Sequence, residues 1–278
     1  MLGIFEGMDG LVDECLGITV LEGAGAPGYR SFASLLALVS SNRDLPQLNL
    51  ADQLLTQAAK NWLTTSAAHR GRSSSRNWQA AKRLAPALPY VSPTMQLNQA
   101  IASATDVHVA NRVPVDSGLL GSVGQRKVAL AEQFDSGCAL IELATTANTP
   151  LAMAIQALQN GMANLFIRTS LVETCHPDWI TSGLPELLKA ASLTLAVLAP
   201  RDFYERFQRA LPFLAEFEAT LNRSLTQSDV CHVTQIPVCF QFEVFPDDFA
   251  WGTQMVESSA NLPEVASAFA TRRRLFAA

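Results

Sequence analysis

The chain has 278 residues, which is enough for one large domain or two modest ones with a sizeable buried core. Charged residues make up only 16% of the chain, against an average of about 25% for soluble proteins, and hydrophobic residues make up 49%. This composition excludes a disordered chain, and it fits either an Ala- and Leu-rich core or a subunit that buries further surface against other chains.

The cysteine count, the charge of the N-terminus and the length of the apolar runs indicate the cellular compartment. Five cysteines, an odd count with no CxxC pair, argue against a disulfide framework. The first 28 residues contain several acids and no Lys or Arg, unlike a secretory signal, and no apolar run approaches the roughly 20 residues of a membrane span. We therefore expect a cytoplasmic protein, or a virion protein assembled in the cytoplasm, with no membrane partner.

Residues 1–90 are predicted to form a helical region that contains a basic segment. Apolar residues at helical spacing predict helices at 29–40 and 50–64, with a short strand at 17–23 before them and a short helix at 76–84 after them. The glycine-containing loop at 23–28 lacks the spacing of a phosphate-binding loop, so a turn is the better interpretation.

The basic segment has three competing interpretations. No Asp or Glu occurs from residue 53 to 105, and the aromatic residues Trp62 and Trp78 lie among the basic ones. The basic residues are Lys60, Arg70, Arg72, Arg76, Lys82 and Arg83, and the C-terminus adds Arg272, Arg273 and Arg274. Such a segment can follow a nucleic-acid backbone, dock on the acidic half (129–257) of a neighbouring subunit, or form a plain solvated loop.

Residues 91–278 are predicted to form an α+β region, either separate from residues 1–90 or continuous with them. The predicted elements are a helix at 93–111 ended by Pro114, a strand hairpin at 125–134 and 136–146, a helix at 150–161, a β-rich run at 164–172, helices at 185–198 and 201–225, a strand at 230–245 and a helix at 263–276. Because helices and strands do not alternate strictly, we expect helices packed on a mostly antiparallel sheet.

Candidate catalytic and metal-binding residues are few. Cys175–His176 and Cys231–His232 together offer a zinc-compatible ligand set, but adjacent residues on a strand point to opposite faces, so we predict no metal site. No catalytic motif is present, and an enzyme site built from Cys175, His176, His232 and Asp247 has no support from spacing. The sequence favours a non-enzymatic protein with no cofactor and no small-molecule substrate.

The most specific local pattern is RVPVDSGLLGSV at 112–123. Pro114 ends the preceding element, Asp116 and Ser117 can close a turn onto the backbone, and Gly118 permits a positive φ. This segment resembles the P-V-D-[ST]-G-x-L-x-S signature of tail-completion (neck) proteins of tailed bacteriophages. The resemblance covers about residues 93–156, where NTPLA at 148–152 is similar to the Asn-x-Pro-Tyr-Ala turn of that family.

The resemblance implies a virion component without catalysis, in which head-to-tail contacts between copies close a ring at the head–tail junction. It makes the turn of Pro114, Asp116, Ser117 and Gly118 structural, and it places the basic segment against a neighbouring subunit or the DNA channel. We therefore expect a structural or assembly protein whose partners are copies of itself and other subunits. The alternative is a nucleic-acid-binding subunit of an intracellular ribonucleoprotein or DNA complex that uses residues 60–83.

Overall fold

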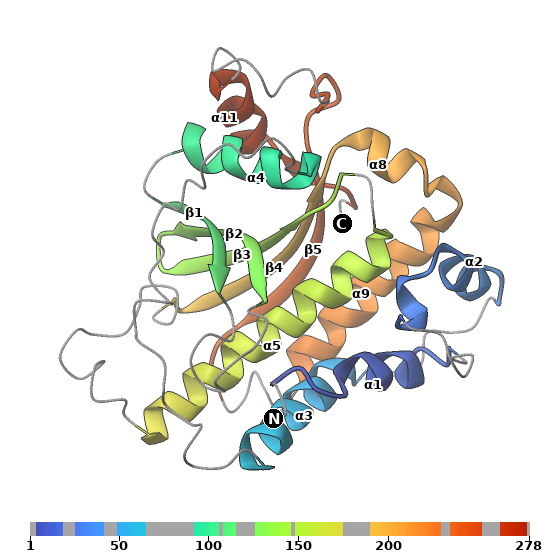
Figure 1. The fold of residues 1–278 in the computed structure, drawn as a ribbon, viewed down its shortest axis with the longest axis vertical. Helices are drawn as coiled ribbons and strands as arrows, with labels where there is room; N and C mark the ends of the chain where they lie inside the picture. The colour runs from blue at the N-terminus through green and yellow to red at the C-terminus, as the bar shows by residue number, and fades with distance from the viewer. Residues whose placement is uncertain are drawn as a thin grey trace.

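The computed structural model shows one sheet with helices on both faces and a further layer of N-terminal helices (Figure 1). It describes residues 4–18, 26–41, 49–64, 92–105, 108–114, 126–145, 148–174, 190–228, 234–251 and 262–276.

The sheet has six strands that lie side by side in the order of the sequence. They are β1 (Val109–Pro114), β2 (Lys127–Phe134), β3 (Gly137–Leu143), β4 (Ser192–Ala199), β5 (Val238–Val244) and β6 (Arg273–Arg274). The β1–β2, β2–β3 and β5–β6 pairs are antiparallel, whereas β3–β4 and β4–β5 are parallel. The predicted α+β class, with helices on a mostly antiparallel sheet, is confirmed.

Helices cover the two faces of the sheet unequally. One face packs against α5 (Pro150–Thr174) and α9 (Leu211–Gln227), the connections on either side of β4. The opposite face is covered by α4 (Pro93–Ala104) and α11 (Leu262–Ala270), which lie together over part of the sheet in Figure 1. Helices α5 and α9 lie in the crossover connections between the parallel strands β3, β4 and β5. Parallel strands need such a crossover, because a tight hairpin reverses the direction of the chain.

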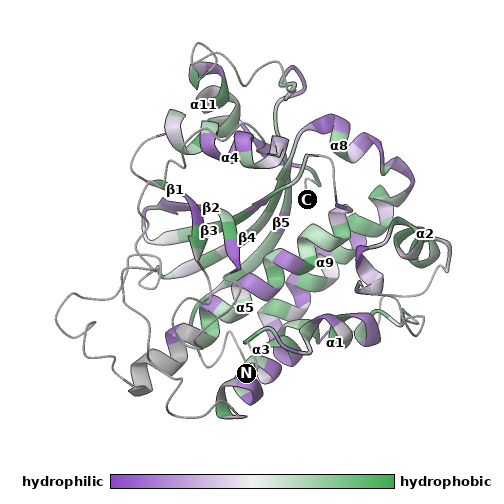
Figure 2. Ribbon diagram, in the orientation of Figure 1, coloured by the Kyte–Doolittle hydropathy of each residue, from purple (hydrophilic) through white to green (hydrophobic). Residues whose placement is uncertain are grey.

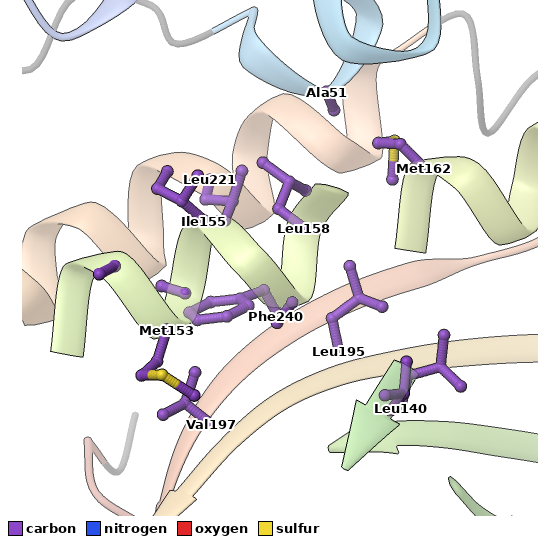
Figure 3. Close-up of a cluster of buried hydrophobic side chains, with 14 of the residues drawn as sticks. Ala51, Leu140, Met153, Ile155, Leu158, Met162, Leu195, Val197, Leu221 and Phe240 are labelled. Carbon is purple, nitrogen blue, oxygen red and sulfur yellow. The ribbon is translucent and has the colours of Figure 1, made fainter. Parts of the chain in front are cut away.

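The N-terminal helices form a third layer on the far side of α5. This layer contains α1 (Met8–Cys15), α2 (Phe32–Ser40) after the 3-10 turn η1 (Gly28–Arg30), and α3 (Leu50–Thr64). Helix α3 packs on α5 and α9, and α1 packs on α3. Apolar side chains of these helices belong to the same hydrophobic cluster as those of the sheet, and Figure 3 shows Ala51 of α3 above Leu158 of α5 and Leu195 of β4.

The burial of the central strands explains their composition. Every residue of β3 is buried, and so are the last five residues of β4, because helices cover both of their faces. In β5 the predicted alternation is confirmed, since Val238, Phe240, Phe242 and Val244 all face the cluster beneath α5 and α9. The hydropathy colouring in Figure 2 accordingly shows a largely apolar centre to the sheet.

Local signals account for several helix boundaries. The predicted helix at 50–64 is confirmed as α3, and the one at 29–40 begins slightly later, where the Ser31 side chain caps α2. Helix α4 begins at Pro93, as predicted, with the Ser92 hydroxyl accepting a hydrogen bond from the Met95 amide. The predicted helix at 201–225 is confirmed in outline as α8 (Arg201–Glu205), η4 (Gln208–Ala210) and α9, which has a proline in its first turn.

Two predictions in the centre of the chain are wrong. The predicted helix at 185–198 is strand β4 from residue 192, because a strand buried on both faces is uniformly apolar and has no period of two. The β-rich run at 164–172 instead continues α5, of which residues 164–166 are buried. A buried stretch of helix shows no alternation between an apolar and a polar face.

Two predicted helices extend too far. The helix at 93–111 ends at Ala104, and the following residues pair with β2 as strand β1. The helix at 263–276 ends at Ala270, and Arg273 and Arg274 pair with β5. The predicted hairpin at 125–146 is confirmed as β2 and β3.

Two further predictions fall largely on residues that the structure does not describe. These are the short helix at 76–84 and all but the first two residues of the strand at 17–23.

The closeness of α5 to the sheet gives the first prediction. A Cβ added at Gly161 of α5 would lie 2.5 Å from a methyl carbon of Leu195, whereas one added at Gly10 of α1 meets nothing within 4 Å. We expect Gly161→Ala to lower the free energy of unfolding by about 1–3 kcal/mol through overpacking. The control Gly10→Ala should raise it by roughly 0.5–1 kcal/mol, because alanine is the better helix former. Urea unfolding of both variants checks this, and equal effects would contradict the packing described for α5.

Candidate functional site

Helix α2 carries the most unusual surface of the described chain. Its nine residues, FASLLALVS, include no charged side chain, yet only Leu35 is buried. Phe32 is 51% exposed, and its ring meets the Phe207 ring edge-on at 5.7 Å, where α2 packs on the segment after α8. Figure 1 places α2 at the rim of the molecule, and Figure 2 shows it as largely apolar. We call Phe32, Ala33, Leu36, Ala37 and Phe207 the α2 surface.

This surface is fixed to the rest of the molecule through the buried Asp13 of α1. The Asp13 carboxylate accepts hydrogen bonds from the backbone N–H groups of Gly28 and Tyr29, each at 2.7 Å. Gly28 is needed at this position, because a Cβ there would lie 2.6 Å from Ile18. Helix α1 therefore sets the path of the chain into α2.

A second polar group joins the N-terminal layer to the sheet and to α5. The carboxylate of Asp9 accepts hydrogen bonds from the Tyr29 hydroxyl at 2.7 Å, the Gln159 amide at 3.0 Å and the Arg30 guanidinium at 3.2 Å. Arg126, just before β2, lies 4.0 Å from Asp9 and donates to Gln159 at 2.5 Å. We call these five residues the Asp9 cluster.

The electrostatics of the Asp9 cluster favour an ionised carboxylate. Burial alone would raise the pKa of Asp9, but hydrogen bonds from Gln159 and Tyr29 and the charges of Arg30 and Arg126 lower it below its ordinary value. Burial, together with its bond to Asp9, raises the pKa of Tyr29 to about 12, so its hydroxyl keeps the proton that it donates. The cluster is therefore a charge-assisted anchor between three layers of the fold.

A third polar group lies inside the core at Glu142 of β3. Its side chain accepts hydrogen bonds from the Asn160 amide at 2.7 Å and the Gln156 amide at 2.9 Å, one turn apart on α5. Burial raises the pKa of Glu142 to about 8, against the opposing effect of these two amides and the backbone of Ala129. No motif marks Glu142 in the sequence, although a single acid in the otherwise uncharged stretch GCALIEL is a visible signal.

The C-terminal arginines lie in ion pairs within the chain. Arg272 pairs with Glu132 and with Glu243, the latter at 2.9 Å, and its guanidinium stacks over the Phe269 ring. The other two are Arg273, which pairs with Asp247 at 2.7 Å, and Arg274, which pairs with Glu218 at 2.7 Å. These three residues, predicted as nucleic-acid or subunit contacts, tie the last strand to the sheet and to α9.

The other predicted contact residues are scattered or lie outside the described chain. Lys60 is exposed on α3. Pro114 ends β1. The other residues of the basic segment lie outside the described residues; they are Arg70, Arg72, Arg76, Lys82 and Arg83. The other residues of the predicted turn, Asp116, Ser117 and Gly118, also lie outside them.

The predicted absence of a metal site concerns residues that are only partly described. Cys175, His176, Cys231 and His232 lie outside the described part of the chain, whereas Asp247 accepts hydrogen bonds from Arg201 and Arg273. Within the described ranges, no group of three or more His, Cys, Asp or Glu side chains could hold a metal ion. The helices of these ranges include none that is long and apolar enough to cross a membrane.

The comparisons with known proteins give no further assignment. No protein-family model, no curated protein and no solved structure matches the chain.

The Asp9 cluster gives the second prediction. We expect Asp9→Asn to lower the free energy of unfolding at pH 7 by about 1–3 kcal/mol, because Arg30 and Arg126 lose their counter-charge. The pKa of Asp9 is lowered in the folded chain, so this contribution is present above the ordinary value of 3.8 and is lost as the pH falls through the folded pKa.

Urea unfolding at pH 7 and near pH 3 checks this prediction, with Asp202→Asn, an exposed acid on α8, as the control. A difference between Asp9→Asn and the natural chain that stays constant from pH 7 to pH 3 would show that its effect is not electrostatic.

Proposed function

We propose that the chain is a non-enzymatic assembly subunit that packs against further copies of itself through the α2 surface. The observation that carries this proposal is an uncharged apolar helix in which, among the described residues, only Leu35 is fully buried. Leu38 and Val39 are partly buried against the core, and Phe32, Ala33 and Ala37 are exposed. Burial of apolar surface stabilises association by roughly 25 cal/mol per Å², so an apolar helix left in water favours a contact that covers it.

The chemistry of this surface favours another copy as the partner. Helix α2 presents no charge through which a basic or acidic partner could be selected, and two copies of a neutral surface meet without like-charge repulsion. The low share of charged residues in the whole chain, 16%, is also typical of a subunit that buries surface against other copies of the same chain.

The specific form of the proposal is a virion component at the head–tail junction of a phage. It rests on the resemblance of residues 93–156 to tail-completion proteins. In its support, β2 and β3 follow the signature in one sheet and helix α4 lies upstream of it, although strand β1, and not the helix, leads into the signature at Pro114. A head-to-tail contact that closes by rotation would give a ring, whereas a two-fold contact would give a dimer.

The third prediction tests this function with a charge placed on the α2 surface. Ala37 is exposed on α2, so Ala37→Glu leaves the core of the single chain unchanged. We expect light scattering after size exclusion to give a closed multimer for the natural chain. For Ala37→Glu we expect at least a tenfold weaker association, because the new charges meet in a desolvated contact.

The matched control is Ala219→Glu on the exposed side of α9, which should assemble like the natural chain. A natural chain that stays monomeric at tens of micromolar, or an Ala37→Glu variant that assembles normally, would exclude the α2 surface. Absorbance in the same run separates the alternative function, since a particle that carries nucleic acid at low salt and loses it at high salt indicates binding by residues 60–83.

A further inference from the structure

Glu142 differs from the other two buried glutamates of the described chain in having no arginine partner. Glu218 pairs with Arg274 and accepts the Phe242 N–H at 2.8 Å, and Glu243 pairs with Arg272. Glu142 is 3% exposed, and its side-chain partners are the two neutral amides of α5. Among the described residues no Lys or Arg lies within ion-pair distance of it.

A carboxylate in this position is energetically unfavourable. A buried charge without a counter-charge is strongly unfavourable, so such groups are commonly neutral. The cation that acts on Glu142 is Arg126, whose guanidinium is already engaged by Gln159 and Asp9. The other ionisable residues on strands at this end of the sheet are Arg112 of β1, Lys127 of β2, Glu243 of β5 and the β6 residues Arg273 and Arg274. Glu243 is paired with Arg272. Strand β4 has none, and α5 has none before Arg168.

The surroundings can also accept the proton of a neutral acid. The Asn160 amide oxygen is buried and has no hydrogen-bond partner. The nitrogen of the same amide lies 2.7 Å from the Glu142 oxygen. Since the amide oxygen and nitrogen are nearly the same size, rotation of this amide brings its oxygen to the carboxyl group, where it accepts the acid proton. The exchange satisfies the orphaned oxygen and keeps the bond to Gln156, and it moves the amide N–H group to the position where that oxygen had no partner.

The position of Glu142 gives this proton a structural consequence. Glu142 joins β3 to the second and third turns of α5, and Gln159 on the same turns joins α5 to Asp9 of α1. We propose that Glu142 is a proton-dependent latch, a neutral acid that holds α5 against β3 and whose ionisation loosens these turns of α5. This inference does not depend on the proposed function.

The first test reads the protonation state directly in the natural chain. Carbon-13 NMR of the Glu142 side-chain carboxyl is expected to show the acid form at pH 7, with its midpoint near pH 8, as the pKa of about 8 requires. A carboxylate signal at pH 7 would overturn the proposal. No variant is needed, so the result does not depend on whether a substituted chain folds.

The second test measures stability against pH and is the fourth prediction. Glu142→Gln keeps the shape of the neutral acid and cannot ionise. The folded-state pKa is raised from 4.5 to about 8, so the stabilisation by Glu142 is complete below 4.5 and is lost as the pH rises to about 8. Between these values, the unfolding constant of the natural chain should rise relative to Glu142→Gln by up to about tenfold per pH unit.

A matched control and a local readout complete the test. Glu216→Gln changes an exposed glutamate on α9 and should follow the natural chain at every pH. Hydrogen exchange at residues 156–163 should be at least about threefold faster in the natural chain than in Glu142→Gln at pH 9, and the two rates should become equal only near pH 4, below the ordinary pKa of 4.5. Parallel stability curves would reject the neutral acid, and equal exchange at pH 9 would reject the loosening of α5.

Discussion

Helix α5 is enclosed by the rest of the molecule, and both the sheet and the N-terminal layer depend on it. From residue 150 to 166, Gln156 is the one residue that is not buried. One side of α5 packs on β3 and β4, and the other side packs on α3. A helix enclosed in this way has no water to satisfy its polar side chains, so each must find a partner in the protein. Gln156, Gln159 and the N–H group of Asn160 meet that requirement and thereby fix how the layers are oriented. The side-chain oxygens of Asn160 and Asn164 are exceptions, since they have no hydrogen-bond partner among the described residues.

The charged residues of the described chain serve mainly this internal organisation. Asp9 and Arg126 anchor α1 to the start of β2, and the three C-terminal arginines pair with acids of β2, β5, α9 and the turn after β5. A low share of charged residues, with many of them used internally, leaves apolar surface to face outward. Helix α2 is the clearest case, since the bonds of Asp13 to the backbone hold η1, and thus the start of α2, in place.

Elements with one solvated face were predictable, and elements enclosed on all sides were not. The helix at 50–64 and the alternation in β5 follow from side chains that divide between core and solvent. Strand β4 lacks such a division, so its uniformly apolar run was assigned to a helix. The run at 164–172 was assigned to a strand from its β-branched and aromatic residues, although it continues α5. The pairing of β1 with β2 was missed because it depends on a tertiary contact rather than on a local preference.

The roles of the candidate surface residues also depend on tertiary contacts that the sequence does not show. The sequence identified α2 as an amphipathic helix, but it gave no sign that only Leu35 would be buried. The C-terminal arginines were interpreted as external contacts because their acidic partners, among them Glu132 and Glu218, are far away in the sequence. Glu142 was passed over because the amides that surround it come from the following helix.

The most direct measurement of the assembly proposal is hydrogen–deuterium exchange of the natural chain in dilute and in concentrated solution, read by mass spectrometry of its peptides. The account predicts that concentration protects residues 32–40 and the segment around Phe207, and leaves the exposed side of α9 unchanged. Protection confined to other segments, or exchange that does not vary with concentration, would contradict it.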